Sequence, residues 1–191
     1  MKPFDLTGSS SITGANVCAA GQAAQTPKST EVFTDTAHAL YPVLFRPEAY
    51  RGQGIPYYSL CIGVFKDDHA TLDRISAAIR LAIAREVVDG KLYGLPLPNG
   101  VLTDETIQSF ATTVHVGELE HPGDKRFEPY VLVNSKSYTR PAVVDVNGQQ
   151  ITDPDAVQHG MMCRAKISFS TYHVRGKYGV SCTLHGVQIL D

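Results

Sequence analysis

The sequence predicts a mainly β protein: a small Greek-key barrel of antiparallel strands, with one amphipathic helix inserted at about residues 68–89 and extra loops. Three observations lead to this fold class. Apolar and polar residues alternate in several segments, one segment has helical spacing, and a C-terminal hairpin contains a glycine bulge. The 191 residues suit one domain, and 43% hydrophobic with 19% charged residues is typical of a globular protein.

The first two strands are expected before residue 66. β-Branched and aromatic residues at 31–45 predict a long first strand, which Pro42 and Pro47 interrupt. Residues 57–65 then alternate, with leucine, isoleucine and valine at the even positions. A period of two places these apolar side chains on one face of a strand. We therefore expect the even positions of this second strand to face the core.

One helix is expected in the middle of the chain. Asp67 or Asp68 can cap it, apolar side chains follow at helical spacing, and Gly90 is expected to end it. Residues 91–123 contain several loop-forming prolines and glycines, and only residues 103–116 are expected to be partly helical. The clearest helix signal in the sequence is therefore the one at 68–89.

The last third of the chain is predicted to be β structure with a first hairpin near residue 147. Residues 130–140 alternate and predict a strand. Asn147-Gly148 favours a type I′ turn, because both residues tolerate a positive φ. This turn would place Val144 opposite Ile151. A short helical turn is then expected at residues 153–155.

A second, longer hairpin follows. Residues 162–174 predict a long strand, and a turn at Gly176-Lys177 would pair Thr171 with Cys182. Beyond Gly186 the apolar positions change from even to odd numbers, as one extra residue in a glycine bulge would produce. Such bulges bend strands around barrel corners. Long bent strands with one internal helix indicate a barrel of the OB type.

The domain organisation is expected to be simple. Residues 1–28 are rich in serine and alanine and predict an N-terminal arm, and residues 29–191 predict the OB-like domain. The first 30 residues contain no apolar run long enough for a signal peptide or a membrane span. The four cysteines are widely spaced with no CxxC pair, so we expect reduced thiols, as in the cytosol.

Basic and aromatic residues alternate on exposed strand faces, and they are the candidate binding residues. Cations follow a phosphate backbone while aromatic rings stack on unpaired bases, so this combination suits single-stranded nucleic acid. A solvated strand face and an ordinary charged turn would give the same patterns, and the net charge of -2 with a pI near 6.4 adds no support. The candidates are Lys136, Tyr138 and Arg140 on one strand, Arg164, Lys166 and Tyr172 on the next, Arg175, Lys177 and Tyr178 at the hairpin tip, and Arg51 and Tyr57, which with Tyr50 flank a glycine-rich loop.

Enzymatic signals are weak. The seven histidines show no HxxxH, HxH or HExxH spacing, and no GxSxG, P-loop or Rossmann motif is present in the sequence. The acidic residues at 67–68 and 153–155 fit helix caps better than a catalytic pair. We therefore expect no enzymatic activity, no cofactor and no metal. A nuclease using dispersed histidines and aspartates is the remaining enzymatic alternative.

The C-terminal part resembles a family of phage and prophage single-stranded-DNA-binding proteins with an OB-type fold. The similarity rests on a run that can be written NSK…P.VVD.NG..ITDPD…G, from Asn134 to Gly160, and extends more weakly back to about Thr30. It implies binding of single-stranded DNA with little sequence specificity during phage DNA replication, recombination or repair in the host cytoplasm. It does not identify the binding residues.

The resemblance leaves several points open. Many such binders end in a flexible acidic tail, whereas this sequence ends Ile189-Leu190-Asp191, so either the natural tail is missing from this sequence or partners are recruited differently. Phage or host replication proteins are possible further partners, as is a second copy of the chain. No membrane partner is expected. The main alternative function is a phage structural or assembly module that binds protein through the same barrel face, as the acidic pI would suit.

Overall fold

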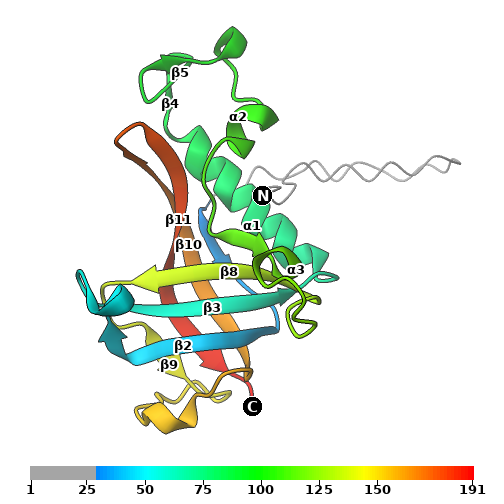
Figure 1. The fold of residues 1–191 in the computed structure, drawn as a ribbon, viewed down its shortest axis with the longest axis vertical. Coiled ribbons are helices and arrows are strands. Elements are labelled where there is room, and N and C mark those ends of the chain that lie inside the picture. The colour runs from blue at the N-terminus through cyan, green and yellow to red at the C-terminus, as the bar shows by residue number, and fades with distance from the viewer. Residues whose placement is uncertain (1–28) are drawn as a thin grey trace, which may run out of the picture.

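A computed structural model describes residues 29–191 and shows a closed β-barrel (Figure 1). Neighbouring strands of the ring pair antiparallel, except that β8 and β11 run parallel. A five-stranded Greek-key ring of this kind is the OB architecture. In spatial order the ring consists of β2 (Ala37–Glu48), β3 (Tyr57–Phe65), β8 (Tyr130–Ser137), β11 (Lys177–Ile189) and β10 (Met162–Val174), which pairs again with β2.

Three short strands extend the ring. β1 (Glu31–Phe33) pairs with β10, β7 (Val114–Val116) pairs with β8, and β9 (Ala142–Val144) runs parallel to β11. The predicted arm at residues 1–28 lies outside the described residues. No helix in the described part of the chain is long and apolar enough to cross a membrane.

The predicted first strand, 31–45, is two strands. The ladder breaks after Phe33, where the Thr34 hydroxyl accepts a hydrogen bond from the Ala165 backbone N–H at 2.9 Å. Contrary to expectation, the prolines do not end β2, which continues to Glu48. Its register with β3 shifts on both sides of Val43. Pro42 and Pro47, which have no backbone N–H to donate, therefore lie where the ladder is already interrupted.

The predicted helix is α1 (His69–Ala84), which begins as expected and ends five residues early. The Asp68 carboxylate accepts from the Thr71 N–H at 3.0 Å, and Ile75, Ile79 and Ile83 are buried against the barrel. After Ala84 the chain forms β4 (Val87–Val88) instead of a further helical turn. The β-branched Val87-Val88 pair and a turn with positive φ at Asp89 and Gly90 favour this hairpin.

The segment between α1 and β8 contains small elements. Only the start of the stretch expected to be partly helical, 103–116, is a helix, and its end is strand β7. Phe110 and Ile107 are buried, so the segment packs onto the barrel. The elements are β5 (Lys91–Leu92) and β6 (Leu95–Pro96), which join β4 in a small sheet, the short helices α2 (Asp104–Gln108) and α3 (Gly117–Glu120), and 3-10 turns at Tyr50–Gly52, Pro98–Gly100 and Pro154–Ala156.

The hairpin near residue 147 differs from the predicted type I′ turn. Only Gly148 has a positive φ, 79°, and Val144 lies opposite Gln150 rather than Ile151. The Asp145 carboxylate accepts from the N–H groups of Asn147 and Gln149, both at 2.8 Å. This side chain stabilises an Asx-type turn that needs one positive φ instead of two. The short helical turn predicted next is confirmed at Pro154–Ala156.

The long C-terminal hairpin has the predicted strands and a different turn. Its loop is Arg175-Gly176, with φ of 51° and 76°, so Thr171 pairs with Val180 instead of Cys182. The error is two residues, which leaves the same side chains on the buried face. The predicted glycine bulge is confirmed, because Lys166 pairs with Gly186 and Ile167 with Leu184.

Candidate nucleic-acid interface

A groove of about 670 Å³ crosses the outward face of β3 and β8. The loop between β2 and β3 borders it on one side, and the β10–β11 hairpin borders it on the other (Figure 1). Oligonucleotides bind OB-folds at this combination of the second and third barrel strands with the neighbouring loops. The groove is lined by Tyr41, Tyr50, Tyr57, Ser59, Cys61, Thr113, Asn134, Ser135, Lys136, Tyr172, Ser181 and Cys182.

Strand register brings the polar side chains of the groove together. Ser59 of β3 lies opposite Lys136 of β8, and Cys61 lies opposite Asn134. Side chains alternate between the two faces of a strand, and Leu60, between Ser59 and Cys61, is buried in the core. The inward leucine thus fixes the outward direction of its neighbours. The same period of two directs Asn134 and Lys136 outward.

Four tyrosine rings give the groove its aromatic surface. Three of them are well exposed: Tyr50 at 64%, Tyr41 at 53% and Tyr172 at 41%. The fourth, Tyr57, is half-buried and meets the exposed ring of Tyr138 edge-on, with centroids 6.4 Å apart. Exposed aromatic rings beside a groove provide the platforms on which unpaired bases stack.

The charge of the groove lining is positive. Lys136 is its cation, and no aspartate or glutamate is among the lining residues. Burial, with a smaller contribution from the Glu120 charge, raises the pKa of Cys61 to about 12, so this thiol stays neutral near pH 7. The guanidinium of Arg51 lies 5.2 Å from the centroid of the Tyr50 ring at the edge of the groove.

One polar atom in the groove has no partner. The Thr113 hydroxyl is buried and makes no hydrogen bond, while the Thr113 carbonyl accepts from the Asn134 N–H at 2.9 Å. An unpaired buried hydroxyl is costly, so such atoms in a native structure call for an explanation. A ligand seated in the groove would supply the missing partner.

The structure brings five of the predicted residues to the groove. Tyr57, Lys136 and Tyr172 line it. Tyr138 joins it through its ring contact with Tyr57, and Arg51 through its contact with Tyr50. β8 ends at Ser137, so Tyr138 lies just past the strand rather than within it as predicted.

The other six predicted residues neither line the groove nor make a ring contact with a tyrosine that lines it. Arg140 lies past the end of β8, with its guanidinium 5.7 Å from the centroid of the Phe45 ring. Tyr178 is half-buried and packs face-to-face against His173, its cross-strand partner beside the hairpin turn, with centroids 4.4 Å apart. Arg175 and Lys177 are exposed at the hairpin tip.

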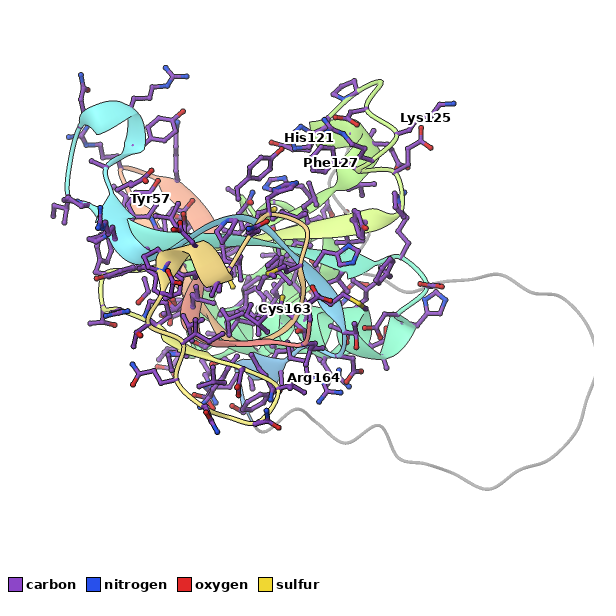
Figure 2. All side chains as sticks on the ribbon, turned by 90° about the horizontal axis from the view of Figure 1, so that it is seen from below. Tyr57, His121, Lys125, Phe127, Cys163 and Arg164 are labelled. Atoms are coloured by element: carbon purple, nitrogen blue, oxygen red, sulfur yellow. The ribbon has the colours of Figure 1, made fainter. Side chains whose placement is uncertain are left out.

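Arg164 and Lys166 line a second depression. They share a strand face with Tyr172, but β10 is long and the β10–β11 ladder bulges between Lys166 and Ile167. The two ends of this strand face therefore point to different sides of the barrel. Figure 2 shows Tyr57 of the groove and Arg164 on different sides.

Sequence reasoning missed several groove residues, of which Tyr41 and Thr113 matter most. Tyr41 has a φ of 49° beside Pro42, which places it at the irregular part of β2. Thr113 immediately precedes β7, a three-residue strand in a segment with weak periodicity. For Tyr41 the sequence offers one weak signal, an aromatic residue next to a proline. For Thr113 it offers none.

The histidines, cysteines and acidic residues of the described chain do not assemble into a metal centre. Residues 29–191 contain no group of three or more His, Cys, Asp or Glu side chains that could hold a metal ion. Cys163 and Cys182 are buried, and burial raises the pKa of both thiols, that of Cys163 to about 12. Cys18 lies outside the described residues. The two buried cysteines act as small apolar core residues.

Comparison with known proteins gives one family and several related structures. Residues 30–191 match a family profile described as "Enterobacter phage Enc34, ssDNA-binding protein". A search of curated protein sequences found no relative.

Two solved structures illustrate the shared fold. The single-stranded DNA-binding protein from bacteriophage Enc34, in complex with ssDNA, aligns with a TM-score of 0.67 and 18% identity over 85% of this chain and 86% of that chain. The gp2.5 single-stranded DNA binding protein of bacteriophage T7 aligns with a TM-score of 0.59 and 15% identity, covering 84% of this chain and 91% of the other. At these identities the likeness shows that the barrel fold is shared.

Proposed function

The chain belongs to the Enc34-type family of phage ssDNA-binding proteins, and from this premise we propose that its groove binds single-stranded DNA. The observation that carries the proposal is a groove with four tyrosine rings and one lysine, and with no acidic side chain in its lining. Domain 29–191 is then the DNA-binding domain. The family description names binding and no reaction, so the protein acts without catalysis.

The groove residues divide the recognition between them. Each exposed tyrosine ring offers a face for stacking, worth about 1–3 kcal/mol per base. Lys136 and, at the edge, Arg51 supply positive charge for the phosphates. Every base has a stackable face, so recognition by stacking and charge reads little sequence. The protein would cover exposed strands during phage DNA replication, recombination or repair in the host cytoplasm.

A titration of labelled oligo(dT) by fluorescence anisotropy tests the proposal. Replacing Tyr50 and Tyr172 together by leucine removes two stacking faces at exposed positions, and we expect at least about a tenfold loss of affinity. The matched control replaces the same two residues by phenylalanine, which keeps the rings and should keep most of the affinity.

Salt separates this function from protein binding. Binding of single-stranded DNA should weaken steeply as salt rises from about 0.05 M to about 0.2 M. No oligo(dT) binding by the wild-type protein at low salt would overturn the proposal. A salt-insensitive complex with another protein through the same groove would instead support the alternative of a phage assembly module.

A further inference from the structure

A second depression, of about 620 Å³, lies at the far end of the β10–β11 ladder from the groove. Its lining includes Phe33 of β1, Arg164 and Lys166 of β10, and Gly186 and Gln188 of β11. Gly186 and Ala142 both line it, and Gly186 packs closely on β9, because a Cβ on Gly186 would lie 3.2 Å from the Ala142 carbonyl oxygen. Like the groove, the depression places positive charge beside an exposed aromatic ring, although its lining also includes Asp35.

The exposed groups of this depression include the ring of Phe33 and the guanidinium of Arg164. Phe33 is 62% exposed, and the Lys166 ammonium lies 5.5 Å from its ring centroid. Arg164 is exposed and forms no ion pair within residues 29–191. Lys166 has a weak ion pair with Glu31, at 3.5 Å. Asp35, which lines the depression, is ion-paired with Arg74 at 2.8 Å, and its pKa is lowered mainly by Arg74 and also by the charge of Arg164.

The ladder between the groove and this depression carries small polar side chains. Ser170 pairs with Ser181, and their hydroxyls are 3.0 Å apart. The Ser168 hydroxyl lies 2.7 Å from the His185 ring nitrogen. The outward positions contain no acidic residue. We call this surface the ladder strip: Tyr172, Ser170, Ser168, Lys166 and Arg164 of β10 with Ser181, Thr183, His185 and Gln188 of β11.

The ladder strip is continuous with the groove, since Tyr172 and Ser181 belong to both. At about 3.3 Å per residue it measures roughly 26 Å from Tyr172 to Arg164. A single strand that fills the groove must leave it at some point. The exit beside Tyr172 leads along outward side chains of β10 and β11 that include no acid, to two cations and an exposed ring. Glu31 of the adjoining β1, opposite Ser168, is the acid beside this path.

We propose that single-stranded DNA leaves the groove past Tyr172 and continues along the ladder strip, with phosphates at Lys166 and Arg164 and a base on Phe33. A phosphate replaces the Glu31 carboxylate as the partner of Lys166. This inference rests on the proposed function of the groove. It extends the binding site around the barrel and makes the affinity depend on oligonucleotide length. Charge complementarity and continuity with the groove favour DNA over a protein as the occupant.

Length-dependent binding of the double variant R164Q/K166Q tests the inference. Glutamine keeps part of each side-chain stem and removes both charges. For oligo(dT) of about 16 nucleotides, near the upper end of OB site sizes, we expect roughly a tenfold loss of affinity and a salt slope smaller by about 1.4. For an oligonucleotide of about 5 nucleotides, which the groove alone can hold, affinity should be unchanged.

The control is K91Q/K125Q, which removes the same charge from two exposed lysines outside both depressions. It should match the wild-type protein at both lengths. Equal binding of the long oligonucleotide by R164Q/K166Q and the wild type would overturn the proposal that DNA follows the ladder strip. It would leave the proposed function of the groove standing. An equal loss for short and long oligonucleotides would also overturn the proposal for the ladder strip. Failure of the wild type to bind any oligo(dT) would be the failure of the proposed function itself.

Discussion

The ring of Tyr172 lies across the backbone of Gly179, its cross-strand partner in the β10–β11 hairpin. A Cβ added to Gly179 would be 2.3 Å from the ring carbon Cζ of Tyr172. Glycine leaves the space that an outward side chain would occupy, and the tyrosine fills it. The position of this groove ring thus depends on the absence of a side chain on the neighbouring strand.

Replacing Gly179 by alanine should therefore move Tyr172 without unfolding the protein. The clash involves the far end of a half-exposed side chain, so the free energy of unfolding should change by less than about 1 kcal/mol. We expect oligo(dT) affinity to fall several-fold, because a displaced ring loses part of its stacking. Anisotropy and urea unfolding measure the two quantities. Unchanged affinity would show that this ring does not stack on DNA.

Lys136 should account for part of the salt dependence. Each phosphate contact with a single strand contributes about 0.7 to the slope of log affinity against log salt. The variant Lys136→Gln should lower the slope by that amount and leave the free energy of unfolding unchanged, since the side chain is exposed. The matched variant Lys91→Gln, outside the groove, should bind with the wild-type slope. A wild-type slope for Lys136→Gln would place the phosphates elsewhere.

Thr113 should show opposite effects on stability and binding. Thr113→Val removes a buried hydroxyl that has no partner, so the free energy of unfolding should rise by about 1 kcal/mol. If a bound strand uses this hydroxyl, oligo(dT) affinity should fall a few-fold. Thr112→Val is the matched control, because the Thr112 hydroxyl accepts from the Val114 N–H and its loss should reduce stability. Lower stability of Thr113→Val would contradict the structure.

The buried thiols should make stability decline at alkaline pH. Burial raises the pKa of Cys61 from 9.0 to about 12, because the charged thiolate loses its hydration. The unfolded chain loses this proton first, so the contribution is fully present below pH 9 and is lost as the pH rises from 9 towards 12. Urea unfolding at pH 8 and pH 10.5 measures the decline, which should be smaller in Cys61→Ala. Rapid alkylation of native Cys61 at pH 8 would argue against the raised pKa.

The faces of the strands were predictable from the sequence, while some registers were not. Placing the turn at Gly176-Lys177 instead of Arg175-Gly176 shifts the predicted pairing by two residues. Because side chains alternate with a period of two, a shift of two residues leaves each side chain on the same face of the sheet. The helix end was misjudged because Val87 and Val88 have acceptable helical spacing but prefer a strand once Asp89-Gly90 can turn.

The groove was only partly predictable because its residues come from distant strands. Alternation showed that Lys136 and Tyr172 point outward, but the same pattern selected Arg164, which shares a strand with Tyr172 and lies on another side of the barrel. That separation depends on the bulge and the bending of β10, a three-dimensional property. Tyr41 enters the groove through an irregular backbone position that alternation cannot indicate.

The closure of the ring by β11 has a consequence for how the chain folds. β11 is the last strand in chain order, and it pairs with β10, β8 and β9. Until β11 leaves the ribosome, β10 and the part of β8 beyond its pairing with β7 keep unpaired edges, and such edges recruit other chains. Contacts between segments far apart in sequence also slow folding. The interval between synthesis of β8 and arrival of β11 is therefore when the nascent protein is most exposed to aggregation.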